Sequence, residues 1–399
     1  MTRRVLLTAL LTAGLLTGAC SPDEYVAPPP TQRTEVADPA VAAETVAALQ
    51  DDIDDPGALA RLGADDDAAQ LLAAVSRNAT GLRLSDVTLR YITETGRTSG
   101  ADAWDGLVAV TWRVEGFDEA SARAEVPVSF ADGGSRIAGI GADGARLPLW
   151  LTGPLVVRRV PGAVVAAAEP AGEIDRYARL ARRAVAATRP LLGGRAGVVV
   201  EVPADAAAVD RTLGVQPGQY SAIAAVTAPV DGSQAPGSPV HVFVNRTVFD
   251  ALDPTAAQVV MTHEAVHAVT GAALVQGAPL WLVEGFADYV ALRDVDLPVS
   301  RTAAQVIKQV KRGGVPAALP ADTDFDPTAT HLGAVYEAAW QVCVVIVEHG
   351  GEGALVALYR RVLGGADVAT ALRAEAGWTE AELTAAWQAR LALLAGVQK

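Results

Sequence analysis

The sequence has few of the residue types that build cross-linked or metal-rich scaffolds. Among 399 residues there are five histidines, two cysteines, two methionines and only 5% aromatic residues. Two cysteines exclude a multi-disulfide scaffold and a cysteine-rich zinc module. The 32 basic and 46 acidic residues give a formal net charge of −14. This acidic balance argues against nucleic acid or an anionic lipid surface as the main partner, since both are bound through clustered Lys and Arg.

Apolar residues, in contrast, make up 51% of the chain. That fraction excludes a mainly disordered protein, and the length suggests two or three units with cores of their own. Because histidine is so scarce, any close group of histidines is a candidate for a function.

The first twenty residues resemble an export signal. Arg3 and Arg4 precede an apolar run, Val5–Leu16, which is followed by three small residues and Cys20. The run is too short to cross a hydrocarbon core of about 30 Å as a helix. The pattern resembles a bacterial lipoprotein signal, which implies that residues 1–19 are removed and that Cys20 is lipidated. An ordinary secretory peptide that happens to contain a cysteine is the alternative.

The lipoprotein resemblance implies a location as well. It predicts an exported protein on the extracytoplasmic face of the cell membrane, held there by the lipid on Cys20. Residues 20–35 are polar and contain three consecutive prolines. Such a segment suits an extended linker between the anchor and the folded part.

A change of hydrophobic periodicity divides the remaining chain into two α+β parts. Residues 36–165 begin with Ala/Leu-rich helical patterns and continue as alternating strands, which predicts a small α+β module that faintly resembles the NTF2-like family. Residues 173–395 begin with a helix and two strands and are almost wholly helical after Asp253. The expected elements are strands at Leu84–Ile92, Leu107–Val114, Ala122–Phe130, Leu155–Val160, Gly197–Val202 and Val240–Asn245, and a helix at Ile174–Leu191.

Two of the five histidines lie on one predicted helix. Asp253 and Pro254 form a strong helix start, and Gly271 is a plausible end. Within this helix His263 and His267 are four residues apart, so both imidazoles share a face and can reach one metal ion. Two histidines that only form hydrogen bonds in a core are the alternative.

The next predicted helix, Pro279–Leu292, supplies carboxylates. Glu284 lies in its apolar stripe, where a carboxylate is costly to bury unless it is paired or metal-bound. Asp288 follows four residues later on the same face and is well placed to accept the remaining ring N–H of a ligand histidine. A solvated helix charge is the alternative for Asp288.

These residues carry a family resemblance. His-Glu-Ala-Val-His, followed after 16 intervening residues by the glutamate of Trp-Leu-Val-Glu-Gly-Phe-Ala-Asp-Tyr, resembles the gluzincin metallopeptidases and is most similar to the bacterial peptidase MA-like group. The resemblance implies His263, His267 and Glu284 as ligands of Zn²⁺. It further implies Glu264 as the general base and Asp288 as the outer support of the ligand shell.

A peptidase of this kind needs a donor for the oxyanion that forms on the scissile carbonyl. Tyr336 is the candidate, because gluzincins commonly use a Tyr or His from a later helix, and His331 is the second choice. Each has a structural alternative: Tyr336 as a core aromatic, and His331 as an exposed residue at a helix start. The strand Val240–Asn245 is a candidate edge for a peptide substrate, with His241 pointing to solvent rather than to metal.

The predicted function is that of a membrane-tethered zinc metallopeptidase with a zincin-like domain over 173–395 and a peptide or protein as substrate. A catalytically idle lipoprotein that binds a peptide or partner around a structural metal is the alternative, although the presence of Glu264 argues against it. In a third view the module 36–165 carries the function by binding a partner. Cys343 is expected to be a small buried residue. The sequence leaves the oligomeric state open.

Overall fold

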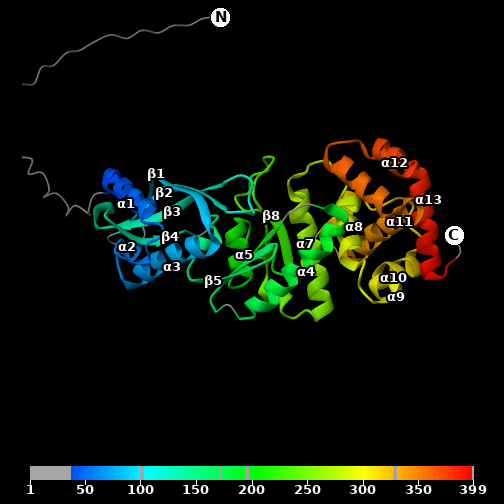
Figure 1. Ribbon diagram of the computed structural model, residues 1–399, viewed down its shortest axis with the longest axis horizontal. Helices are drawn as coiled ribbons and strands as arrows, with labels where there is room; N and C mark the ends of the chain where they lie inside the picture. Colours follow the sequence, from blue (N-terminus) through cyan, green and yellow to red (C-terminus); the bar gives the residue numbers. More distant parts are fainter. Residues whose placement is uncertain are drawn as a thin grey trace, which may run out of the picture.

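The structure is a computed structural model that describes residues 37–98, 103–142, 144–170, 172–193, 197–326 and 330–397. The predicted signal peptide, the lipidation site Cys20 and the linker 20–35 lie outside the described residues. The fold is α+β, as predicted. An N-terminal module, a second sheet with its helices and a C-terminal group of helices follow one another along the long axis of the molecule (Figure 1).

The N-terminal module consists of three helices followed by an antiparallel meander with the strand order β1-β2-β3-β4. Each helix begins at an aspartate, Asp38, Asp55 or Asp65, whose side chain accepts hydrogen bonds from backbone N–H groups of the first turn. The elements are α1 (Pro39–Asp51), α2 (Pro56–Ala60), α3 (Asp66–Leu82), β1 (Leu84–Thr98), β2 (Trp104–Val114), β3 (Ala122–Ala131) and β4 (Arg136–Ile140), with short 3₁₀ helices at Asp132–Gly134 and Leu149–Leu151.

The second sheet is mixed and has the strand order β5-β6-β7-β9-β8. Its three central strands, β6, β7 and β9, are parallel, and the two edge strands are antiparallel to their neighbours. The elements of this part are β5 (Leu155–Val160), β6 (Ala163–Ala168), α4 (Ile174–Leu192), β7 (Val198–Val202), α5 (Ala206–Leu213), β8 (Ala225–Pro229), β9 (Val240–Val244), α6 (Arg246–Phe249) and α7 (Pro254–Thr270).

The predicted boundary at residue 165 is wrong. Strand β5, expected in the N-terminal module, turns at Gly162 and pairs with β6, which in turn pairs in parallel with β7. The second sheet therefore begins at Leu155 rather than after 173. Strand β6 was not predicted, because its residues, Ala163–Ala168, are all buried and show no alternation of apolar and polar residues.

Apolar side chains cover both faces of the second sheet. One face, with Val199 and Phe243, shares a hydrophobic core with the N-terminal module, including Trp150. The other face packs against α4 and α7 through side chains such as Tyr177 and Met261. The N-terminal module thus forms one of the two layers that cover the sheet, and its removal would expose an apolar surface.

The C-terminal part is helical, as predicted. Its elements are a 3₁₀ helix at Ala272–Leu274, α8 (Leu280–Leu292), α9 (Val299–Thr302), α10 (Ala304–Gly313), a 3₁₀ helix at Asp322–Phe325, α11 (Leu332–Leu363), α12 (Val368–Ala376) and α13 (Glu380–Ala395). A capping box opens α13, where Thr379 and Glu382 bond reciprocally.

Helix α11 is kinked at Gly351, where φ is +81°. By length and composition alone this helix could span a membrane. In the structure it packs against α8, α10, α12 and α13 and forms the centre of the helical core.

Candidate metal centre

Helix α7 begins and ends as the sequence predicts. Asp253 accepts hydrogen bonds from the N–H groups of Thr255 and Ala256, Pro254 occupies the first turn, and the helix ends at Gly271 with φ of +66°. Its buried face packs on the second sheet. The sheet therefore fixes the rotation of the helix that carries the two histidines.

Helix α8 lies close to α11 at a glycine, Gly285, that was not predicted as part of the site. A Cβ atom at Gly285 would lie 2.4 Å from the carbonyl oxygen of Ala339 in α11. Only glycine allows this approach, which sets the distance of Glu284 and Asp288 from α11. The position of Gly285 directly after Glu284, a predicted ligand, was the one feature of the sequence that could have indicated this close contact.

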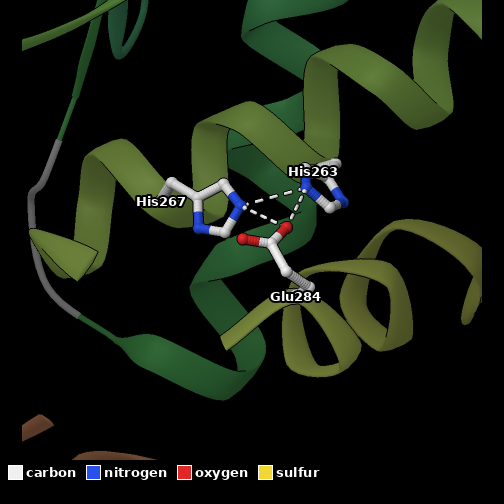
Figure 2. A group of neighbouring side chains, drawn as sticks. All are labelled: His263, His267 and Glu284. Carbon is white, nitrogen blue, oxygen red and sulfur yellow. Dashed lines mark hydrogen bonds and ion pairs between the residues drawn. The ribbon is translucent and has the colours of Figure 1, made fainter. Parts of the chain in front are cut away.

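The side chains of His263, His267 and Glu284 converge on one point (Figure 2). The Nε2 atoms of the two histidines are 3.0 Å apart, and Oε2 of Glu284 lies 3.1 Å from Nε2 of His263 and 3.3 Å from Nε2 of His267. Three potential metal donors from two helices thus face one another without an intervening side chain. This group could hold a metal ion.

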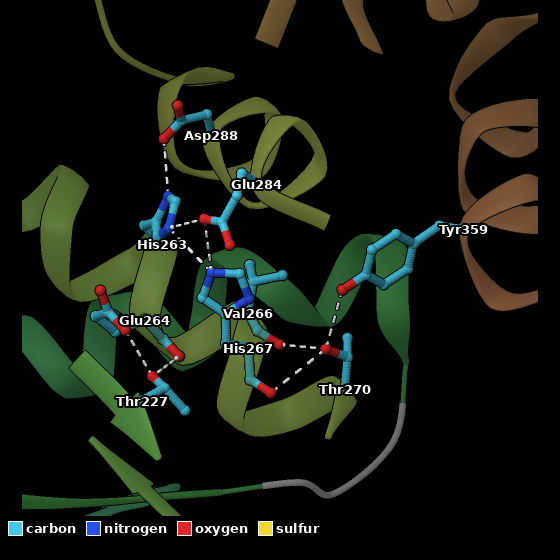
Figure 3. A network of polar contacts seen from close by, with 9 residues as sticks. All are labelled: Thr227, His263, Glu264, Val266, His267, Thr270, Glu284, Asp288 and Tyr359. Carbon is cyan, nitrogen blue, oxygen red and sulfur yellow. Dashed lines mark hydrogen bonds and ion pairs between the residues drawn. The ribbon is translucent and has the colours of Figure 1, made fainter. Parts of the chain in front are cut away.

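Asp288 lies behind His263. Its Oδ1 is 2.8 Å from Nδ1 of His263 (Figure 3). When Nδ1–H donates to this carboxylate, the lone pair of Nε2 is directed at the convergence point. The structure thus makes the contact that the i, i+4 spacing of Glu284 and Asp288 suggested.

The carboxylates control the charge on His263. Burial disfavours its protonated form, but Asp288 and Glu284 outweigh burial and raise the pKa of His263 well above its usual value. Burial likewise opposes ionisation of Glu284, but His267 and His263 lower the pKa of its carboxyl group. Because a ligand imidazole must be neutral, binding of a metal ion here displaces the proton of His263.

Glu264 lies beside this group and not within it. The residue is 8% exposed. Its carboxylate is directed toward Thr227 of strand β8, whose Oγ1 is 2.7 Å from Oε2 of Glu264 (Figure 3). Thr227 was not predicted as a site residue, because no local pattern in the sequence shows that its strand lies against α7.

Tyr336 comes from α11 and reaches the same region. Its ring centroid is 6.0 Å from that of His263 and 5.4 Å from that of Phe325. Burial raises the pKa of Tyr336, and the carboxylates of Glu284, Asp288 and Glu264 raise it further, so the phenol stays protonated and is able to donate a hydrogen bond.

His331 differs from Tyr336 in its surroundings. It is exposed and occupies the N-cap position of α11. This position matches the alternative given for His331, that of an exposed residue at a helix start. Of the two residues considered for an oxyanion donor, Tyr336 is the one with a ring contact to a histidine of the centre.

The expectation for His241 is wrong, since this residue does not point to solvent. It is 1% exposed; its Nδ1 is 2.7 Å from a carboxylate oxygen of Glu201, and its Nε2 is 3.1 Å from one of Asp118. The reason is that β9 lies inside the sheet, and the N-terminal module, which contributes Asp118, covers this face. The strand predicted as the substrate edge is therefore internal, and its neighbour β8 is one of the two edge strands.

Cys343 is fully buried in the helical core, as expected, and lies near Gly285. Burial is the main reason that the pKa of its thiol lies well above the usual value. A protonated buried thiol is a poor nucleophile, so this cysteine packs as a small apolar residue.

Comparison with known proteins adds no assignment to this geometry. No protein-family model matches the chain, and no curated protein has a significantly similar sequence. The arrangement of the residues alone therefore carries the functional argument.

Proposed function

We propose that this protein is a zinc-dependent metallopeptidase whose centre consists of His263, His267 and Glu284. The observation that supports this proposal is the convergence of two imidazole nitrogens and one carboxylate oxygen, with a further glutamate, Glu264, beside them. Three protein donors leave a coordination position open, which distinguishes catalytic zinc sites from closed structural ones.

The donor set and its spacing fit zinc. Imidazole and carboxylate are usual zinc ligands at about 2.0–2.2 Å, and a tetrahedral ion with such bonds keeps its donors roughly 3.3–3.6 Å apart. The three donor atoms are separated by 3.0, 3.1 and 3.3 Å. Shifts of a few tenths of an ångström would therefore accommodate the ion.

The chemistry divides between the ion and the side chains. When bound, zinc supplies a Lewis acid that polarises a carbonyl group and lowers the pKa of water. Glu264 accepts a proton from the attacking water as the water oxygen bonds to the carbonyl carbon, and it delivers the proton to the amine nitrogen when the C–N bond breaks. Tyr336 donates a hydrogen bond to the oxyanion.

The sheet supports a peptide as the substrate. Strand β8 is an edge of the second sheet and is antiparallel to β9, so its free backbone groups are able to pair with an extended peptide. Thr227 of the same strand contacts Glu264, so the edge lies directly beside the proposed base. A peptide added there would pass its carbonyl groups close to the centre.

We also propose that the chain is anchored through a lipid on Cys20. The support for this proposal is the sequence pattern at the N-terminus. Metabolic labelling with a fatty acid tests it. A labelled, membrane-bound product is expected, and an unlabelled secreted product, or a Cys20→Ala variant that stays anchored, would reject it.

The peptidase proposal is tested with purified wild type, Glu264→Gln and Glu125→Gln, each analysed for zinc and incubated with a peptide library. Glu264→Gln removes only the base, so we expect bound zinc to be unchanged and hydrolysis to fall by about 10²–10⁴-fold. Glu125 is exposed on β3 and provides the matched control, which keeps full activity. If Glu264→Gln hydrolysed peptides as fast as the wild type with an unchanged zinc content, Glu264 would not be the base. Bound zinc without any hydrolysis in the wild type would favour the idle alternative.

A further inference from the structure

The hydroxyl group of Thr227 contacts the proposed base at two atoms. Its Oγ1 lies 2.7 Å from Oε2 and 3.0 Å from the backbone carbonyl oxygen of Glu264. A hydroxyl carries one hydrogen, and both of these oxygens are acceptors. The shorter contact to the charged carboxylate therefore takes the hydrogen bond.

The sheet, and not the helix, fixes this hydroxyl. Thr227 pairs with Val242 of β9, and side chains alternate along β8. Ala225 belongs to the core formed with α7, whereas Val226 packs on the side of the N-terminal module. Thr227 thus points at α7 from the middle of a short strand, and its β-branched side chain has little freedom about χ1.

We propose that Thr227 is the positioning residue for Glu264. Its hydroxyl group holds one carboxylate oxygen and leaves the other oxygen to face the attacking water. The inference rests on the proposed function, in which Glu264 is the base. Because Thr227 belongs to the edge strand, the strand proposed to pair with a peptide also holds the base.

Kinetics of the full mature chain loaded with zinc provide the first test. Thr227→Val keeps the branched shape and removes the hydroxyl group, whereas Thr227→Ser keeps the hydroxyl group. We expect Thr227→Val to lower kcat about 10-fold with KM and zinc content unchanged, because small displacements of a catalytic group are costly. Thr227→Ser should stay within about twofold of the wild type. Thr188→Val, which removes a buried hydroxyl group of α4 that bonds a backbone carbonyl, is the matched control.

Two kinetic results would overturn the inference. One is an unchanged kcat in Thr227→Val. The other is an equal loss in Thr227→Val and Thr227→Ser, which would show that the packing of the side chain matters and its hydroxyl group does not.

Crystal structures of wild type, Thr227→Val and Thr227→Ser provide a test that needs no activity. We expect the Glu264 carboxylate to be displaced or split between conformers in Thr227→Val and to keep its place in Thr227→Ser. An undisplaced carboxylate in Thr227→Val overturns the inference. Were the zinc-loaded wild type to hydrolyse no peptide, the proposed function would fail, but the carboxylate positions would still decide whether Thr227 holds Glu264.

Discussion

Two groups of histidine and carboxylate lie on opposite sides of the second sheet. On the side of α7, His263 and His267 each point one nitrogen at the same place as Glu284. On the side of the N-terminal module, a single histidine, His241, uses its two nitrogens for two separate carboxylates. Both groups are largely buried and contain similar residues.

The difference lies in the direction of the donor atoms. At the first group two imidazoles and a carboxylate direct three donor atoms at one point, which a metal ion can occupy once it displaces the proton of His263. At the second group no other histidine is present, and the protonated ring of His241 is itself the cation between two carboxylates. We infer that the first group binds metal and that the second joins the N-terminal module to the sheet through Asp118. On this inference the same residue types bind metal on one face and hold the module on the other.

Replacing one histidine in each group should give the largest difference between the two groups, measured as bound zinc. His267→Ala removes one of three donors, so we expect the folded protein to retain essentially no zinc after dialysis. His241→Gln should keep the zinc content of the wild type. Elemental analysis of the folded fraction, checked by circular dichroism, measures both. Loss of zinc from both variants, or from neither, would remove the distinction.

Tyr336→Phe should affect catalysis and not the metal. Loss of one oxyanion donor typically lowers kcat by about 10²–10³-fold, and we expect this with KM and zinc content unchanged. Steady-state kinetics on a peptide found in the library digest give the values. Tyr91→Phe, a hydroxyl deletion in the N-terminal module, is the control. Comparable kcat values for the two variants would exclude Tyr336 as the donor.

The group of His241, Asp118 and Glu201 should make the free energy of unfolding depend on pH. Burial disfavours the charge on His241, but Asp118 and then Glu201 outweigh it and raise its pKa to about 9, from the usual 6.5. Since the pKa is higher in the folded state, this stabilisation is complete below pH 6.5 and is lost as the pH rises through 9. The loss in the free energy of unfolding is on the order of 3 kcal/mol.

Urea unfolding of wild type and His241→Gln between about pH 6 and pH 10 measures this loss. The stability difference between the two proteins should be largest at the acidic end and should shrink as the pH rises. A difference that does not vary with pH would show that the pKa of His241 is the same in the folded and the unfolded protein.

Asp288→Asn and Asp118→Asn make the same chemical change in the two groups, since each replaces a carboxylate that contacts a histidine, His263 or His241. Loss of the carboxylate behind His263 should weaken zinc binding by about 10–100-fold, as is usual for a partner of a ligand histidine. Asp118→Asn should leave zinc binding as it is. Competition with a chromophoric chelator gives both affinities. If both variants bind zinc as the wild type does, Asp288 does not support the centre.

The sequence predicts the centre well because its geometry is local. Helical spacing alone brings His263 and His267 onto one face and Glu284 and Asp288 onto another. The caps of α7 and the helices that follow Asp253 are likewise predictable, because each depends on residues that are close in the sequence. Only the approach of α7 and α8 depends on the fold.

What the sequence does not predict depends on pairings between distant segments. Thr227 and Glu264 are 37 residues apart and meet because β8 lies at the edge beside α7. His241 is buried because a module more than a hundred residues earlier covers its face of the sheet. Strand β6 is not predicted, because an alanine-rich strand buried on both faces lacks the alternation of apolar and polar residues that identifies a half-buried strand.

A zinc titration of activity tests the central claim most directly. The metal-free protein, prepared with a chelator, is supplied with increasing zinc while both peptide hydrolysis and bound zinc are followed, with Glu284→Gln beside the wild type. The account predicts that hydrolysis rises in proportion to bound zinc, levels off at about one ion per chain, and is absent in Glu284→Gln. Hydrolysis that does not depend on zinc, or undiminished zinc-dependent hydrolysis in Glu284→Gln, would contradict it.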